Sequence, residues 1–196
     1  MPPDERSRFF AAALSAFMSF AALGLFTGLA GTFLSVTLHH PSRALAGAVL
    51  CAMFAAGVAA QMLTAAWRAT RQFEAGMAAL VIGLGLAVAA VWLRSPSLAL
   101  FIVGGVLIGA GGGAIFRAAV GTVMSIASPD RVAESLAGLF LSAFVGISLP
   151  VVGAGITLAQ GVSLEVTILG FAITVSVGIA VAAVNLAGRT RARSSV

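Results

Sequence analysis

The stretch "SPSLALFIVGGVLIGAGGGAIF", from Ser95 to Phe116, carries no charged side chain. A helix needs about 20 mainly apolar residues to cross a hydrocarbon core of about 30 Å, and this stretch is long enough. Five further charge-free stretches approach or exceed that length, at residues 9–42, 44–67, 75–93, 135–164 and 166–188. The sequence therefore predicts six membrane-spanning helices.

The composition of the chain supports the same class. Hydrophobic residues make up 60% of the chain and charged residues 9%, with a mean hydropathy of +1.11. A soluble globular domain carries far more charge. A membrane β-barrel would show short segments that alternate apolar and polar residues, whereas these stretches are continuously apolar. Because backbone groups in lipid need partners within the chain, we expect an all-α membrane protein.

The charge-free stretches also set the expected domain bounds. One bundle covers residues 9–187, flanked by a tail at 1–8 and an arginine-rich tail at 188–196. The first apolar run is longer than the core of a secretory signal, so we expect it to be a retained helix. The six helices are expected at residues 9–38, 44–66, 73–93, 97–127, 132–160 and 163–187.

The arginines predict which way the bundle faces. All eleven basic residues are arginine, and most of them fall in the tails and the even-numbered loops: Arg6, Arg8, Arg68, Arg71, Arg131, Arg189, Arg191 and Arg193. The positive-inside bias then places both termini in the cytoplasm, so the cytoplasmic membrane is the expected location. The net charge of +5 follows from this topology, and no separate basic patch predicts nucleic-acid binding.

Three short segments of the chain recur in the same order, about 90 residues apart. The pairs are "GTFLSV" (31–36) with "GTVMSI" (121–126), "LAG" (45–47) with "LAG" (136–138), and "GLAVAAV" (85–91) with "GIAVAAV" (178–184). They suggest a duplicated three-helix unit, with copies at about 9–93 and 97–187. Since three crossings is an odd number, the second copy would run opposite to the first, which predicts a 3+3 inverted-topology repeat.

A longer run carries a resemblance to a known family. With the six-helix pattern around it, "GVLIGAGGGAIFRAAVGTVMSIASPDRVAESLAGLFLSAFVGISLPVVGAG" (Gly105–Gly155) resembles the C-terminal half of a bacterial major facilitator superfamily transporter. The similarity extends from about Phe9 to Leu186. It implies secondary transport of a small molecule by alternating access. It also implies that the first and fourth helices line the cavity, the second and fifth face the other half, and the third and sixth are peripheral.

Two features depart from the superfamily pattern. The loop "QMLTAAWRATRQ" (Gln61–Gln72) lacks the glycine and the aspartate of the superfamily's Gly-x-x-x-Asp-Arg loop. A superfamily transporter also has twelve helices, so this chain would need a second copy, in a homodimer, or a separate six-helix half. The alternative is a non-transporting six-helix remnant or packing-partner subunit.

None of the six acidic residues lies securely inside the membrane, so we expect this half not to supply a proton-coupling site. Asp130, Arg131 and Glu134 follow the fourth expected helix. They fit the start of a helix, where the dipole favours acids. The alternative is a cytoplasmic gate in which these three residues form ion pairs with Arg68 or Arg71.

Arg117 is the one charge that interrupts an apolar helix. At about 1.5 Å per residue it lies about 15 Å from the inner helix end, near the hydrocarbon boundary. It either reaches the interface or a structural partner, or it contacts an anion or substrate in the cavity. The expected substrate pathway combines it with the repeated segments and consists of Gly31, Ser35, Arg117, Gly121 and Ser125.

Small residues at helical spacing on the first and fourth helices predict close packing between helices. The alternative is a gate surface along which helices slide. A proline inside the fifth helix removes one backbone hydrogen bond and should kink that helix. The expected packing residues are Gly24, Gly28, Gly105, Gly109, Gly113 and Pro150.

The sequence does not favour an enzyme. An intramembrane protease needs a nucleophile or metal ligands paired with a base inside the bundle. There is no Gly-x-Ser-x-Gly or His-Glu-x-x-His motif, and the two histidines, His39 and His40, are adjacent in an expected loop. We therefore expect no catalytic residues, no metal and no cofactor. The expected partners are the lipid bilayer, an unidentified small molecule and a second six-helix bundle.

Overall fold

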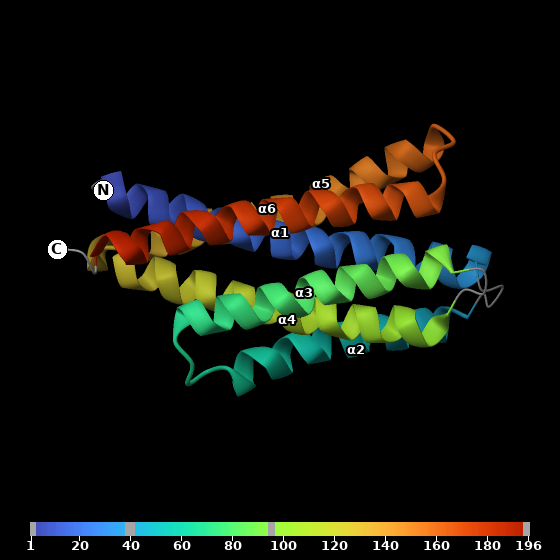
Figure 1. Ribbon diagram of the computed structural model, residues 1–196, viewed down its shortest axis with the longest axis horizontal. Helices are drawn as coiled ribbons and strands as arrows, with labels where there is room; N and C mark the ends of the chain where they lie inside the picture. Colours follow the sequence, from blue (N-terminus) through green and yellow to red (C-terminus); the bar gives the residue numbers. More distant parts are fainter. Residues whose placement is uncertain (1–2, 38–41, 94–96, 194–196) are drawn as a thin grey trace.

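The computed structural model describes residues 3–37, 42–93 and 97–193, and six long helices make up nearly all of this part of the chain. The helices alternate in direction, and the start of α1 lies at the same end of the bundle as the end of α6 (Figure 1). Their bounds are α1 (Pro3–Thr32), α2 (Arg43–Leu63), α3 (Ala69–Trp92), α4 (Leu98–Ile126), α5 (Val132–Ala159) and α6 (Leu164–Arg193). All six are long and apolar enough to cross a membrane. The expected all-α class and six spans are confirmed, and the protein is a multi-pass membrane protein.

Two helices extend beyond the bounds that hydropathy alone indicates. α1 begins at Pro3 and α6 ends at Arg193, so both expected tails contribute helix. α1 is followed directly by a π-helical segment, η1 (Phe33–Thr37), which a search for apolar runs does not reveal. A short 3-10 turn, η2 (Pro129–Arg131), leads into α5.

α1 and α4 form the centre of the bundle. They bury the largest shares of their spans, α3 and α6 bury intermediate shares, and α2 and α5 bury the smallest. α1 packs against α5 and α6, α4 packs against α2 and α3, and the two central helices contact each other. Aromatic rings fill this central contact: the Phe101 ring stacks on Phe26 and Phe33, with centroid separations of 4.5 and 4.2 Å.

Glycines allow the central helices to approach their neighbours at backbone distance. A methyl group added to Gly109 of α4 would meet the backbone carbonyl of Met53 on α2, and one added to Gly113 would meet the carbonyl of Gly57. Gly24 of α1 is in the same position against the carbonyl of Ile147 on α5. Such close approach is typical of helix packing in lipid, where dispersion replaces the hydrophobic effect as the main attraction.

The other expected packing residues have different surroundings. Gly105 lies under the Phe26 ring, whereas Gly28 faces the Val151 side chain of α5. Pro150 is buried, and α5 continues through it as a single helix from Val132 to Ala159. The three expected packing glycines of α4 therefore face two different helices, Gly105 facing α1 and Gly109 and Gly113 facing α2.

Candidate functional site

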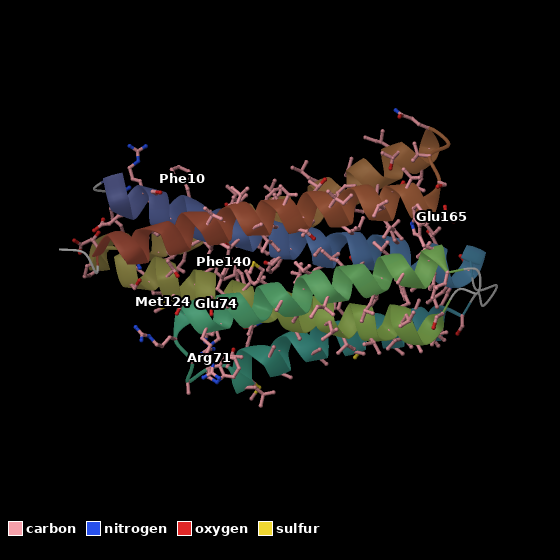
Figure 2. The ribbon with its side chains drawn as sticks, in the orientation of Figure 1. Phe10, Arg71, Glu74, Met124, Phe140 and Glu165 are labelled. Atoms are coloured by element: carbon pink, nitrogen blue, oxygen red, sulfur yellow. The ribbon has the colours of Figure 1, made fainter. Side chains whose placement is uncertain are left out.

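A cavity of about 460 Å³ opens at the end of the bundle that holds the α2–α3 loop. The first turns of α1, the loop after α2, the start of α3 and the last turns of α4 surround it. Figure 2 shows Arg71, Glu74 and Met124 at this end, and Glu165 at the opposite end. The polar and aromatic side chains that line the cavity are Arg8, Trp67, Gln72, Arg117, Thr122 and Ser125.

Side-chain contacts hold the α2–α3 loop beside the cavity. The buried Gln72 donates from Nε2 to the backbone carbonyl of Thr64, at 2.6 Å. The Arg71 guanidinium lies over the Trp67 ring, 4.4 Å from its centroid, which is a cation–π contact. These contacts tie the end of α2 to the start of α3 and fix one wall of the cavity.

The two hydroxyl groups on the α4 wall already donate hydrogen bonds to backbone carbonyls. Thr122 Oγ1 donates to the carbonyl of Ala118 at 2.8 Å, and Ser125 Oγ donates to the carbonyl of Thr122 at 2.7 Å. A hydroxyl has one proton to donate and two lone pairs to accept with. Both oxygens can therefore accept a hydrogen bond from a molecule in the cavity.

The cavity lining carries two arginines and no acidic residue. Over residues 5–35, 42–93 and 97–184, whose side chains the structure describes, the one ion pair is Arg131–Glu134, at 2.7 Å. The side chains of Arg8 and Arg117 form no hydrogen bond or ion pair with any residue that the structure describes. Among the residues whose side chains the structure describes, the lining is therefore positively charged and carries no neutralising acid.

The expected substrate pathway divides between the two ends of the bundle. Arg117, Gly121 and Ser125 all line the cavity. Gly31 and Ser35 lie at the opposite end, where Ser35 Oγ donates to the carbonyl of Gly31 at 2.8 Å. Both serines are exposed, and neither glycine has an atom within 4 Å of where a Cβ would stand. The repeated segments thus present similar small, open surfaces at opposite ends.

The expected cytoplasmic gate is not assembled among the described residues. Arg131 pairs with Glu134, its neighbour on the first turn of α5, and Arg71 covers Trp67. Neither Asp130 nor Arg68 forms an ion pair there. The pairing of Arg131 with Glu134 fits the start of a helix, which is the first of the two expected alternatives. His39 and His40, of the expected outer loop, lie outside the described residues.

A second, smaller cavity of about 140 Å³ lies between α1, α2 and α4. Its walls are aromatic and small residues, among them Phe20, Gly57, Gly109 and Phe116, with Gln61 as the polar member. It borders the glycine contacts between α2 and α4. We assign no chemistry to it.

Sequence reasoning missed three polar members of the larger cavity, Arg8, Gln72 and Thr122. It placed Arg8 in a tail, yet α1 already includes this residue, one position before the first charge-free stretch. Gln72 and Thr122 carry no motif that marks them, because their roles depend on how α2, α3 and α4 meet. A helix predicted to continue from the tail would have brought Arg8 into consideration.

Comparisons of the chain with family models, with curated proteins and with solved structures found no match.

Proposed function

We propose that this chain is half of a secondary transporter of the major facilitator type, which moves a small molecule by alternating access. It acts in the cytoplasmic membrane with both termini in the cytoplasm. The observation that carries the proposal is the packing pattern of the six helices, and the cavity between α1 and α4 supports it.

The main contacts between helices map onto one another when the first three helices are exchanged with the last three, although α4 packs more extensively on α3 than α1 does on α6. The exchange turns the α1–α5 contact into the α4–α2 contact, and the α1–α6 contact into the α4–α3 contact. The order of burial follows the same pairs: α1 with α4, α3 with α6, and α2 with α5. An inverted repeat has this property, because a twofold axis in the membrane plane relates its two units.

The repeated segments supply the two mouths of the pathway. Ser35 and Ser125 would be equivalent residues at opposite faces of the membrane, each beside an open glycine surface. The mouth at Ser125 holds the cavity of about 460 Å³. Alternating access would open one mouth while it closes the other.

A half-transporter needs a second bundle, and α2 and α5 offer the faces for it. Large apolar side chains are exposed on both helices, including Phe54 and Val58 on α2 and Phe144, Leu149 and Val152 on α5. Lipid or another bundle must cover them. We propose a homodimer, or a pair with a separate six-helix chain, joined through these faces.

The orientation is tested with a reporter that is active only outside the cytoplasm. We expect activity when it is inserted in the loop at His40 and none when it is fused to Val196, because the arginine-rich ends should stay inside. Western blots must show equal amounts of both fusions. The reverse pattern of activity would overturn the topology.

Assembly and motion are tested together with spin labels in lipid nanodiscs. Cys51 is exposed, so it is first replaced by alanine, and Ser35→Cys or Ser125→Cys is then labelled. In a homodimer, each label should give two inter-protomer distances. The fraction of dimers with a long distance between the Ser125 labels should equal the fraction with a short distance between the Ser35 labels, because the opening of one end accompanies the closure of the other.

The rival function makes a different prediction in the same nanodiscs. A non-transporting packing subunit should give one distance at each end. A strictly monomeric particle, purified with all neighbouring gene products present, would contradict the half-transporter proposal and favour the remnant.

A further inference from the structure

The geometry points to the arginine-lined cavity as a binding site for a phosphodiester that carries hydroxyl groups, such as the headgroup of phosphatidylglycerol. This is a proposal about binding alone, and it would stand even if the chain carried no solute. Two independent features of the lining support it: cationic donors without a partner among the described side chains, and hydroxyl oxygens that donate to the backbone and have lone pairs free to accept.

The cationic donors are Arg8 and Arg117. Neither has a hydrogen-bond or ion-pair partner among the residues whose side chains are described, whereas Arg131 pairs with Glu134 and Arg71 covers Trp67. The planar guanidinium group matches two oxygens of a phosphate at once. An anion between the two arginines would neutralise charges that no lining residue neutralises.

The depth of Arg117 places its guanidinium group within reach of the lipid phosphates. α4 has 29 residues and is about 44 Å long, so its ends extend about 7 Å beyond a hydrocarbon core of about 30 Å. Arg117 precedes the end of α4 at Ile126 by nine residues, or about 14 Å, which is about 7 Å inside the core. A long arginine side chain reaches from that depth to the headgroup layer. Basic pockets between membrane helices are typical binding sites for anionic headgroups.

The acceptors select the rest of the headgroup. The hydroxyl protons of Thr122 and Ser125 are donated to backbone carbonyls, so these oxygens are free to accept from the ligand. The glycerol hydroxyls of phosphatidylglycerol can donate to them. The ammonium group of phosphatidylethanolamine would instead be brought towards two arginines, which disfavours it.

The same phosphate chemistry could come from a soluble source, such as glycerol 3-phosphate or inorganic phosphate. Lipid and soluble sources differ in whether an acyl anchor at the membrane surface is needed. The experiment therefore compares both kinds of ligand on the same protein.

The test measures thermal unfolding of the full-length, delipidated protein in neutral detergent. We expect phosphatidylglycerol to raise the midpoint, phosphatidylmethanol to raise it less because it lacks the hydroxyls, and phosphatidylethanolamine to leave it unchanged. Arg8→Gln and Arg117→Gln should each weaken the affinity for phosphatidylglycerol about tenfold, as loss of a charge-assisted pair does. Arg131→Gln is the matched control and should retain the full response, because Arg131 lies outside the cavity.

Each variant is compared with its own midpoint without lipid, so a general loss of stability does not mimic a loss of binding. Native mass spectrometry of the same samples counts the bound lipids. An equal rise with glycerol 3-phosphate or inorganic phosphate would overturn the phosphodiester assignment and assign the site to a soluble phosphate. The proposal is overturned if no phosphate compound raises the midpoint, or if both arginine variants respond like the unmodified protein. Neither result bears on transport, which the spin labels test.

Discussion

A Gly109→Ala substitution should lower the free energy of unfolding by about 2 kcal/mol, the cost expected when an extra methyl group is forced into a well-packed contact. The methyl group would meet the backbone carbonyl of Met53 on α2. A backbone cannot rotate away as a side chain can, so α2 and α4 must separate along their contact. The free energy is measured by titration with sodium dodecyl sulfate in mixed micelles.

The matched control is Gly85→Ala on α3. Gly85 is also inside a helix, but no atom lies within 4 Å of where its Cβ would stand. Alanine there should change the stability little or raise it slightly, because alanine favours helix. Gly113→Ala should reproduce the loss, since its methyl group would meet the carbonyl of Gly57. Equal effects at Gly85 and Gly109 would show that the contact between α2 and α4 is looser than described.

The second large effect is expected in the labelling of introduced thiols. With Cys51 replaced by alanine, Ser35→Cys should react with a membrane-impermeant maleimide only from outside, and Ser125→Cys only from the cytoplasm. The two serines lie at opposite ends of the bundle and both are exposed, so the contrast should be nearly all or none. Labelling is followed by mass spectrometry on cells and on inside-out vesicles.

Two outcomes of this labelling separate fold from function. Reaction of both thiols from one face would contradict the opposite placement of the repeated segments. If each thiol reacts from its expected side, but no candidate substrate changes the two labelling rates in opposite directions, the proposed topology is retained and the result counts against transport. The variant with Cys51→Ala alone shows the background reaction.

Most of the fold could be predicted because lipid imposes simple rules on a sequence. Continuous apolar runs such as the one from Ser95 to Phe116 can only be spanning helices in such a composition. The ends of the helices were less predictable, since charges near Pro3 and Arg193 extend a helix into water without a hydropathy signal. The π-helical segment at Phe33–Thr37 depends on local hydrogen bonding, which apolar patterning does not encode.

The candidate site could be predicted only in part. Arg117 stood out because a charge within an apolar helix is unusual. Its neighbours Arg8 and Gln72 did not, because they come from other helices and meet Arg117 only through tertiary packing. The glycines were identifiable as packing residues, but which helix each one faces depends on rotations that spacing alone does not determine.

The packing partners of the helices also determine the order in which the protein can fold during synthesis. α1 and α2 pack mainly on helices of the second half, α1 on α5 and α2 on α4. As the ribosome releases the first three helices into the bilayer, they have few contacts to make with one another. The glycine-containing faces of α2 and α3 remain exposed to lipid until α4 is inserted and packs against both helices. A chain interrupted before Leu98 would therefore leave three inserted but unassembled helices, a natural substrate for the quality-control proteases of the membrane.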